Sequence, residues 1–254
     1  MKVIAIIPAR LASTRFPGKP LADILGLPMI EHIRRRVKRC SLISDVIVAT
    51  CDQEIFDVVT SYGGKAAMTA KTHERGTDRI AEVAMSLHAD VFINVQGDEP
   101  LVDPEMLGLL LDPLSSNNDL QCTNLMTEIT DDEEFNNPNV VKAVCDNQGK
   151  ALYFSREPIP SVLKAGKMQF KKFKQLGIYA FRSAFLQLFT KLSPTLLEQI
   201  ESVDMLRAVE HGYIVKMVQS PFKVIGVDTP DDLQRVLPLM KKDKLFPLYQ
   251  EKIR

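Results

Sequence analysis

Short apolar runs alternate with amphipathic segments along the first half of the chain. Lys2–Ile7 has the pattern of a buried strand, and Pro28–Cys40 follows it with Ile30, Ile33 and Val37 at helical spacing. The same alternation predicts further strands and helices in turn at Asp45–Thr50, Glu54–Ser61, Lys65–Met68, Asp78–Leu87 and Asp90–Val95. This order predicts an α/β fold with a mostly parallel sheet covered by helices.

From Leu120 onward the order changes. Strand patterns follow one another without long helices between them, at Leu120–Ile129, Val140–Cys145 and Ala151–Phe154. We therefore expect an inserted antiparallel portion at about residues 120–195. The Lys-rich stretch Ser155–Gln175 has little periodicity and is predicted to be a long loop. The remaining predicted elements are helices at Ser183–Lys191, Thr195–His211 and Pro230–Met240, and strands at Tyr213–Val218 and Lys223–Val227.

Charge and composition restrict the function. The 254 residues include 32 Lys and Arg and 32 Asp and Glu, so the formal net charge is zero. A neutral chain is not attracted as a whole to nucleic acid or anionic lipid, so any anionic ligand must be held locally. The 4 cysteines are too dispersed for a disulfide framework or a zinc site. Because there is neither a signal peptide nor an apolar run of the roughly 20 residues that a membrane span needs, we expect a cytoplasmic protein.

A basic loop follows the first predicted strand, where α/β proteins bind ligands. Within Pro8–Pro20, the cations Arg10, Arg15 and Lys19 are interspersed with Ser13 and a glycine. Guanidinium and ammonium groups can meet the oxygens of a polyphosphate. The spacing is not that of a Walker A loop, because Ser13 stands where that motif has its first glycine. A solvated surface loop is the alternative, but the position after a strand and the rigid Pro-Gly-Lys-Pro sequence favour a phosphate site.

Two acidic motifs follow later strands. Asn94–Pro100 places Asp98 after a strongly apolar strand, too far upstream to cap the helix expected near Asp103. Asp228 lies in Gly226–Asp232, a segment that is also a good helix start. A carboxylate beside bound phosphate needs a cation between them, so the pair predicts a Mg²⁺ site.

His73–Arg79 opens the helix after the third strand. Backbone amides at a helix start can bind a base or a phosphate, and Arg79 adds charge. His73 by itself is more typical of an ordinary loop histidine.

The basic run Arg34–Arg39 lies opposite the apolar face of its predicted helix, where Glu31 can pair with Arg35. We interpret it as a solvent-exposed face rather than a nucleic-acid site. No Ser/His/Asp or Cys/His set stands out, so covalent nucleophilic catalysis is not supported.

Taken in this order, six segments of the chain resemble the 3-deoxy-manno-octulosonate (Kdo) cytidylyltransferases, namely Pro8–Leu21, His73–Arg79, Asn94–Pro100, Ala151–Arg156, Leu176–Tyr179 and Gly226–Pro230. The resemblance implies a Rossmann-like sheet of the nucleotide-diphospho-sugar transferase type in a single domain, 1–254. It also implies a homodimer built through the inserted portion. The implied reaction converts CTP and Kdo to CMP-Kdo and pyrophosphate, for bacterial lipopolysaccharide or capsule synthesis.

The resemblance also implies roles for individual residues. Those implied to hold the CTP phosphates are Arg10, Ser13, Arg15 and Lys19. In the mechanism that we expect, Arg10, Arg15 and Lys19 neutralise the pyrophosphate leaving group, with Arg10 and Lys19 counted as catalytic. Those implied to place the nucleotide are Gly76, Thr77 and Arg79. Asp98 and Asp228 would bind Mg²⁺ and serve catalysis, and Arg156 would face the carboxylate of the sugar.

Three positions on the sugar side depart from the family pattern. Gln175 replaces a histidine, and Asp204 and Met205 replace a Glu-Gln pair, while Arg75 stands elsewhere in place of a common serine. We therefore expect Gln175 and Asp204 to face an altered sugar pocket. Three alternatives stay open: a variant acid sugar such as 8-amino-Kdo or a nonulosonic acid, another nucleotide, or a non-catalytic nucleotide-binding regulatory protein.

Overall fold

The computed structural model describes residues 1–222 and 224–250. The chain divides into two compact units, one formed by Met1–Gly108 with Val224–Arg254 and the other by Leu109–Lys223. The inserted portion expected at about 120–195 falls within the residue range of the second unit. Helix α4, Pro104–Ser116, contains the point at which the chain passes from one unit to the other.

The first unit contains a parallel sheet with the strand order β6-β1-β4-β5. Its strands are β1 Val3–Ala9, β4 Asp45–Thr50, β5 Lys65–Met68 and β6 Val91–Val95. Every residue of β1 is buried, as is typical of a central parallel strand covered on both faces. The prediction of an α/β fold with a mostly parallel sheet is confirmed, and the predicted bounds of β4 and β5 are correct.

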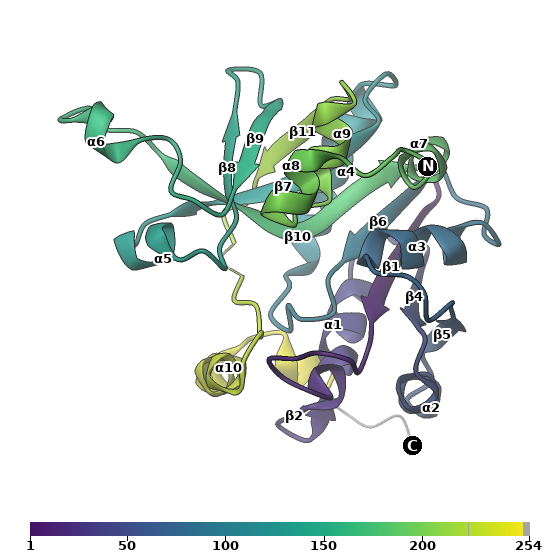
Figure 1. The fold of residues 1–254 in the computed structure, drawn as a ribbon. Coiled ribbons are helices and arrows are strands. Elements are labelled where there is room, and N and C mark those ends of the chain that lie inside the picture. Colours follow the sequence, from purple (N-terminus) through teal and green to yellow (C-terminus); the bar gives the residue numbers. More distant parts are fainter. Residues whose placement is uncertain (223, 251–254) are drawn as a thin grey trace. The chain divides into compact units, whose positions relative to one another are not determined.

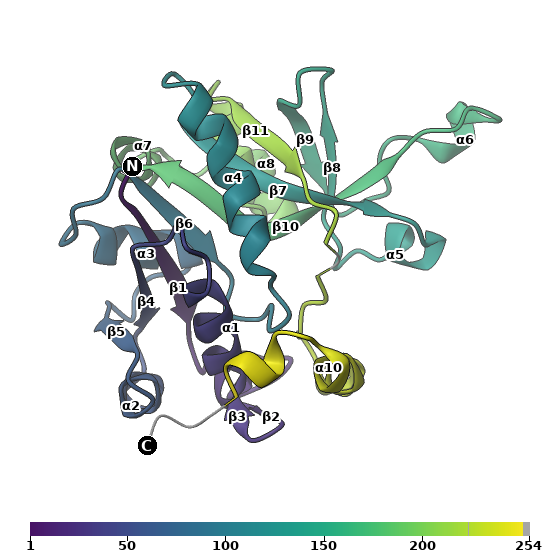
Figure 2. The ribbon, with the colours of Figure 1, turned by 180° about the vertical axis from the view of Figure 1, so that it is seen from behind.

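Helices cover both faces of this sheet. They are α1 Met29–Lys38, α2 Gln53–Ser61 and α3 Gly76–Ala84. The chain steps from β1 to β4 to β5 in one direction, then returns past β1 to β6 through α3. Since parallel crossovers are right-handed, α3 lies on the face opposite α1 and α2. Figure 1 shows α3 in front of the sheet, and the reverse view in Figure 2 brings α1 to the front.

The rest of the first unit consists of short elements and one long helix. These are η1 Lys19–Leu21, β2 Asp23–Ile24, β3 Leu27–Pro28, α10 Pro230–Lys242 and η2 Phe246–Leu248. The strand predicted at Lys223–Val227 is wrong over residues 224–227, and Lys223 lies outside the described residues. A backbone hydrogen bond from Val227 to the carbonyl of Asp98 (2.8 Å) holds this segment, which has no strand pairing.

Arg34, Arg35 and Arg36 are buried, so the prediction that the basic run is solvent-exposed is wrong for these three residues. It is correct for Lys38 and Arg39, which are exposed. Glu31 is fully buried and accepts hydrogen bonds from Arg34 (2.7 Å) and Arg35 (2.9 Å). Arg36 is 2% exposed and pairs with Asp243 at 2.7 Å, beyond the end of α10. The predicted pair of Glu31 with Arg35 is present. The C-terminal segment folds back onto α1 and supplies partners for two of these arginines, the Tyr249 carbonyl for Arg35 and Asp243 for Arg36.

The second unit contains the strand order β11-β7-β10, with β8 joined to β10 and β9 joined to β8. The strands are β7 Cys122–Ile129, β8 Lys142–Cys145, β9 Ala151–Ser155, β10 Lys172–Arg182 and β11 Val215–Gln219. Apart from the parallel pair of β11 with β7, these pairings are antiparallel, as predicted. Figure 1 shows β8 and β9 as neighbouring strands of a hairpin.

Five short helices belong to this unit: α5 Asp132–Asn136, α6 Val162–Ala165, α7 Ser183–Phe189, α8 Leu196–Glu201 and α9 Met205–Glu210. Phe181, Phe185 and Phe189 pack against one another with ring centroids 5.7–6.3 Å apart and form an aromatic core between β10 and α7. Among residues 1–222 and 224–250, no helix combines the length and apolar character needed to cross a membrane.

The long loop predicted at Ser155–Gln175 is wrong at its C-terminal end, where β10 already begins, and α6 lies within it. Lys172 and Lys174 belong to β10 and pair with Asp132 (2.6 Å) and Glu134, two acids of α5. Their charges made the segment resemble a loop, but the opposing acids allow these lysines to lie in a strand.

The helix predicted over Thr195–His211 is two helices, because Ser202 adopts a left-handed conformation with φ of 53° that ends α8. A bidentate ion pair joins the two helices across the break. Arg207 donates to both carboxylate oxygens of Glu198 at 2.6 and 2.8 Å, and both side chains are buried.

Candidate nucleotide and metal site

The basic loop leaves β1 at Ala9 and is held at both ends. Near its start, the Leu11 amide donates to the carboxylate of Asp52, at the N-cap of α2, over 2.7 Å. At its end, Gly18 takes φ of 70° and its amide donates to the carbonyl of Leu11 over 3.2 Å. This closure directs the next residue, Lys19, back toward the sheet.

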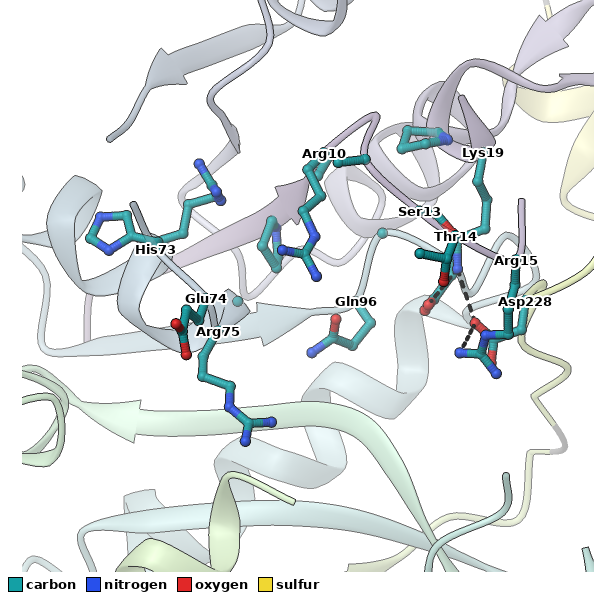
Figure 3. Close-up of a pocket in the computed structure, with 18 residues that line it drawn as sticks. Arg10, Ser13, Thr14, Arg15, Lys19, His73, Glu74, Arg75, Gln96 and Asp228 are labelled. Carbon is teal, nitrogen blue, oxygen red and sulfur yellow. Dashed lines mark hydrogen bonds and ion pairs between the residues drawn. The ribbon is translucent and has the colours of Figure 1, made fainter. Parts of the chain in front are cut away.

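Lys19 lies between the two predicted metal-ligating acids. Its Nζ is 3.0 Å from Oδ2 of Asp98 and 3.1 Å from Oδ1 of Asp228. The same oxygen of Asp228 is 3.2 Å from Nη2 of Arg15. Figure 3 shows Arg15, Lys19 and Asp228 converging at one end of the pocket. The structure thus brings together two acids that are separated by 130 positions in the sequence and that we predicted to meet.

Local backbone features place both acids. A Cβ at Gly97 would lie 2.7 Å from the carbonyl oxygen of Pro8, so only glycine lets the end of β6 approach β1 this closely. In the other motif, Thr229 and Asp232 form a capping box at the start of α10. Since Thr229 caps the helix, the Asp228 carboxylate is available to Lys19 and Arg15. The helix-start interpretation of this motif is therefore correct, and the neighbouring Asp228 is left to face Lys19.

Lys19 is protonated in this setting. Burial alone would lower its pKa, but the charges and hydrogen bonds of Asp98 and Asp228 together raise it above the ordinary value. Its side chain is 12% exposed, against 32% for Asp98 and 40% for Asp228. The two carboxylates therefore remain open to solvent on one side and can accept a further cation.

A pocket of about 370 Å³ lies beside this cluster, within the range typical of small-molecule sites. Its charged lining residues are Arg10, Arg15, Lys19, Glu74, Arg75, Arg79, Asp98 and Asp228. Five of these are cations and three are anions, so the pocket has a cationic excess in a chain whose total charge is zero. The other polar side chains of the lining belong to Ser13, Thr14, His73 and Gln96. The pocket is suited to a polyanion.

The start of α3 forms one wall. Gly76 and Arg79 line the pocket, while Thr77 is buried and is not among the lining residues. Arg79 is 3% exposed and donates to the hydroxyl of Thr69 and to the Ala70 carbonyl at 3.3 Å. Its guanidinium thus supports the adjoining loop as well as contributing positive charge to the pocket.

His73 contacts Glu82 through Nε2, and the Ala70 amide donates to the same carboxylate at 3.0 Å. Although partial burial opposes the change, these two contacts lower the pKa of Glu82. This local role agrees with the interpretation of His73 as an ordinary loop histidine.

Four polar or charged lining residues were missed as site residues: Thr14, Glu74, Arg75 and Gln96. Gln96 directly precedes Gly97 in the motif that carries Asp98, so its position after β6 was the available signal. Figure 3 shows its side chain between Arg75 and Arg10. Thr14 and Glu74 carry no signal beyond adjacency to predicted residues.

Ser13 lines the pocket, and its Oγ also accepts a hydrogen bond from the Phe16 amide at 3.3 Å, which stabilises the loop.

The predicted sugar-side residues belong to the second unit. Gln175 donates from Nε2 to Oδ1 of the buried Asn124 over 2.6 Å. Asp204 occupies the N-cap position of α9.

Arg156, the remaining sugar-side residue, follows β9 directly. It donates from Nε to the Glu201 carbonyl at 2.6 Å and from Nη1 to the Pro138 carbonyl at 3.0 Å. Carbonyls are neutral, so these contacts orient the guanidinium without cancelling its charge.

The donor chemistry at Asp98 and Asp228 fits Mg²⁺. Mg²⁺ is commonly held by one or two carboxylates, with water and substrate phosphates completing its coordination. Within residues 1–222 and 224–250, no group of three or more His, Cys, Asp or Glu side chains could hold a metal by itself. The two converging carboxylates therefore suit an ion that arrives with a phosphorylated substrate, rather than a permanently bound metal.

The fold and the site together define a nucleotidyltransferase, and the comparisons with known proteins agree. The cytidylyltransferase family model matches residues 4–219. The 3-deoxy-manno-octulosonate cytidylyltransferase of Geotalea uraniireducens (strain Rf4) is 47% identical over 251 residues, covering 95% of this chain and 100% of the relative. The chain belongs to the 3-deoxy-manno-octulosonate cytidylyltransferase family.

Solved structures give the same result. A CMP:2-keto-3-deoxy-manno-octonic acid synthetase complexed with CTP matches with a TM-score of 0.89 and 40% identity, over 95% of this chain and 99% of that one. A cytidylyltransferase from Leptospira borgpetersenii serovar Hardjo-bovis matches with a TM-score of 0.64 at 17% identity, over 96% of this chain and 88% of that one. The second likeness shows a shared fold.

Proposed function

We propose that this enzyme transfers CMP from CTP to Kdo and releases pyrophosphate. The single observation that carries the proposal is the pocket at the end of β1, where Lys19 lies between Asp98 and Asp228 beside a cationic excess. The names of the relatives supply the nucleotide and the acid sugar.

The cationic loop would bind the triphosphate. Arg10, Arg15 and Lys19 present guanidinium and ammonium groups to one pocket, and Ser13 adds a hydroxyl. Gly76 and Arg79 would place the nucleotide from the wall formed by α3. Thr77, buried just behind this wall, would act by fixing the start of the helix.

Asp98 and Asp228 would hold Mg²⁺, which when bound stabilises negative charge on phosphate oxygens and orients them. The chain's own contribution here is to place both carboxylates beside Lys19 and to leave them partly open to solvent. Lys19 would exchange part of its contact with these acids for contact with phosphate.

The reaction is an in-line displacement at the α-phosphorus. The C2 hydroxyl oxygen of the sugar forms a bond to that phosphorus, the bond to the bridging oxygen breaks, and the hydroxyl proton passes to solvent. Arg10, Arg15 and Lys19 would neutralise the departing pyrophosphate. Positioning and charge stabilisation account for the catalysis, because phosphoryl transfer requires no covalent bond between the protein and the substrate.

The acid sugar would be read by the second unit. Arg156 would bind the sugar carboxylate, since carbonyl contacts orient its guanidinium and leave its charge uncompensated by them. Gln175 and Asp204 would contact the sugar hydroxyls. A variant acid sugar is the second candidate substrate. Gln175 stands where the family usually has histidine, and its side-chain amide donates a hydrogen bond to Asn124.

A second copy of this chain would be the protein partner. The second unit exposes large apolar side chains, including Leu152 at 59%, Leu196 at 69% and Ile200 at 67%. Leu196 and Ile200 are four residues apart on one face of α8. An exposed apolar face of this kind is typical of an interface, and we propose a homodimer in the cytoplasm.

One assay tests the proposed function. Pyrophosphate release is measured with each NTP and a panel of acid sugars, namely Kdo, 8-amino-Kdo and nonulosonic acids, with and without Mg²⁺. We expect turnover with CTP and Kdo that requires Mg²⁺. Preference for another acid sugar would show that this sugar, and not Kdo, is the substrate. CTP binding without turnover would establish a regulatory protein instead.

A further inference from the structure

A fully buried lysine opens β8 in the second unit. Lys142 has 0% exposure, and a buried ammonium is costly unless it is fully hydrogen-bonded. Burial lowers its pKa. The proposed reaction gives this residue no task, and it lies outside the nucleotide pocket.

The Lys142 ammonium joins two segments that are separate in sequence. It donates to the carbonyls of Asn137 at 3.0 Å and Val140 at 2.6 Å, both in the loop before β8. Its third contact is the carbonyl of Arg156, just after β9. An ammonium has three N–H donors, so these three carbonyls use all of them.

The other side of the Arg156 backbone is held as well. The Arg156 amide donates to Oε2 of Glu201 at 2.8 Å. The other carboxylate oxygen of Glu201 accepts from Ser155 Oγ at 2.9 Å and from the Tyr153 hydroxyl at 3.2 Å. The polar backbone groups of Arg156 are therefore fixed between a buried ammonium and a carboxylate that is itself oriented by two hydroxyls.

Lys142 also acts on the Arg156 side chain. Nη1 of Arg156 donates to the carbonyl of Pro138, which lies between Asn137 and Val140, the loop residues that Lys142 holds. Loss of the Lys142 ammonium would release both the backbone of Arg156 and the loop that receives its guanidinium. A group that reads a carboxylate must be held within about 0.5 Å of its working position.

We propose that Lys142 is a positioning residue for the acid-sugar site, because it fixes both the backbone and the guanidinium direction of Arg156. The inference rests on the proposed function, in which Arg156 binds the sugar carboxylate. Since the nucleotide pocket is built from the first unit, loss of Lys142 should affect the sugar and leave CTP binding unchanged.

The test is the steady-state kinetics of Lys142→Met, a side chain of similar length without charge or donors, with CTP and Kdo each varied at saturating partner. We expect the KM for Kdo to rise about tenfold or more, and the KM for CTP to stay within twofold. The matched control is Lys172→Met, which removes a lysine of the same unit that pairs with the exposed Asp132. Both KM values should be unchanged in the control.

Glu201→Gln is the second variant, used for the same comparison if Lys142→Met does not fold. It weakens the hold on the Arg156 amide from the opposite side and should also raise the KM for Kdo selectively. The inference is overturned if the folded variant changes neither KM, or raises both equally, while the wild-type enzyme makes CMP-Kdo. If the wild-type enzyme makes no CMP-Kdo, the proposed function and this inference fail together.

Discussion

Two basic stretches of the first unit contrast in how their charges are used. The loop after β1 presents Arg10, Arg15 and Lys19 to an open pocket. The stretch in α1 is denser in charge, yet Arg34 and Arg36 are 4% and 2% exposed and already paired within the chain. Charge density therefore does not identify a binding site. The site is the stretch whose cations keep solvent access and outnumber the anions around them.

The contrast is explained by the ion pairs that each stretch makes. In α1, the fully buried Glu31 receives Arg34 and Arg35 together, and a charge in such a place needs all of its partners. At the pocket, Lys19 shares two acids that stay 32% and 40% exposed. The first arrangement stabilises the fold, whereas the second can exchange partners when a ligand enters.

The largest effect we expect comes from Glu31→Gln. The change leaves two buried guanidinium groups without a carboxylate, which should lower the free energy of unfolding by about 3–5 kcal/mol. Chemical denaturation measures this loss, and turnover per folded molecule should be unchanged. A large loss of turnover in the folded variant, with normal stability, would place the α1 stretch in the active site and reverse the comparison.

The next largest effect that we expect is a loss of stability at acid pH, caused by His32 of α1. His32 is fully buried, its Nε2 donates to the Ile24 carbonyl at 2.8 Å, and its Nδ1 accepts from the Tyr249 hydroxyl at 3.0 Å. Burial lowers the pKa of His32 from the ordinary 6.5 to about 4. The unfolded chain therefore takes up this proton first as pH falls.

Above pH 6.5 His32 has no effect on stability, and between pH 6.5 and 4 it destabilises the fold progressively. The loss at the acid end is about 3 kcal/mol at 1.36 kcal/mol per pKa unit. Between pH 6.5 and 4, the free energy of unfolding of His32→Gln should fall by about 3 kcal/mol less than that of the wild-type protein, as measured by chemical denaturation at each pH. Equal slopes for the two proteins would contradict a buried neutral imidazole.

At the pocket, Asp98→Asn should lower kcat by about 100-fold or more, the scale of losing a principal electrostatic group. The matched control is Asp231→Asn, which changes an exposed acid in the first turn of α10. Its kcat should equal that of the wild-type enzyme. Near-normal turnover of Asp98→Asn at saturating Mg²⁺ would remove this carboxylate from the proposed metal site.

A smaller effect is expected from Lys19→Met, about 30-fold in kcat/KM for CTP, because Arg10 and Arg15 still face the phosphates. Stability should change little, since the acids that Lys19 contacts remain hydrated. Lys65→Met, which removes an exposed lysine paired with Asp45, is the control. A loss of stability as large as that of Glu31→Gln, without loss of activity, would make Lys19 a structural residue.

The sequence predicted the first unit closely because its elements are short, apolar and bounded by turn residues. β4 and β5 match their predicted ranges. The two acidic motifs meet as expected, but only Asp98 follows a strand of the sheet, while a backbone hydrogen bond from Val227 to the Asp98 carbonyl brings in the Asp228 segment. The buried state of Arg36 could not be predicted, because its partner Asp243 lies 207 positions away. Local spacing gives the face of a helix but not what covers it.

The second unit was harder to predict because charged side chains occupy its strands. Lys172 and Lys174 lie in β10 since two acids of α5 oppose them, a pairing that depends on the tertiary fold. Ser202 breaks a long helical pattern through one left-handed residue, for which serine gives no strong signal. The sequence likewise gave no reason to single out Lys142, whose three carbonyl partners come together only in the folded chain.

The most direct test of the central claim measures Mn²⁺, as a spectroscopic substitute for Mg²⁺, by electron paramagnetic resonance in the presence of CTP. We expect the wild-type enzyme to bind the ion with its nucleotide, and the double variant Asp98→Asn with Asp228→Asn to fold but not to bind the ion. Equal Mn²⁺ binding by the two proteins would contradict the claim that these carboxylates hold the ion beside the triphosphate.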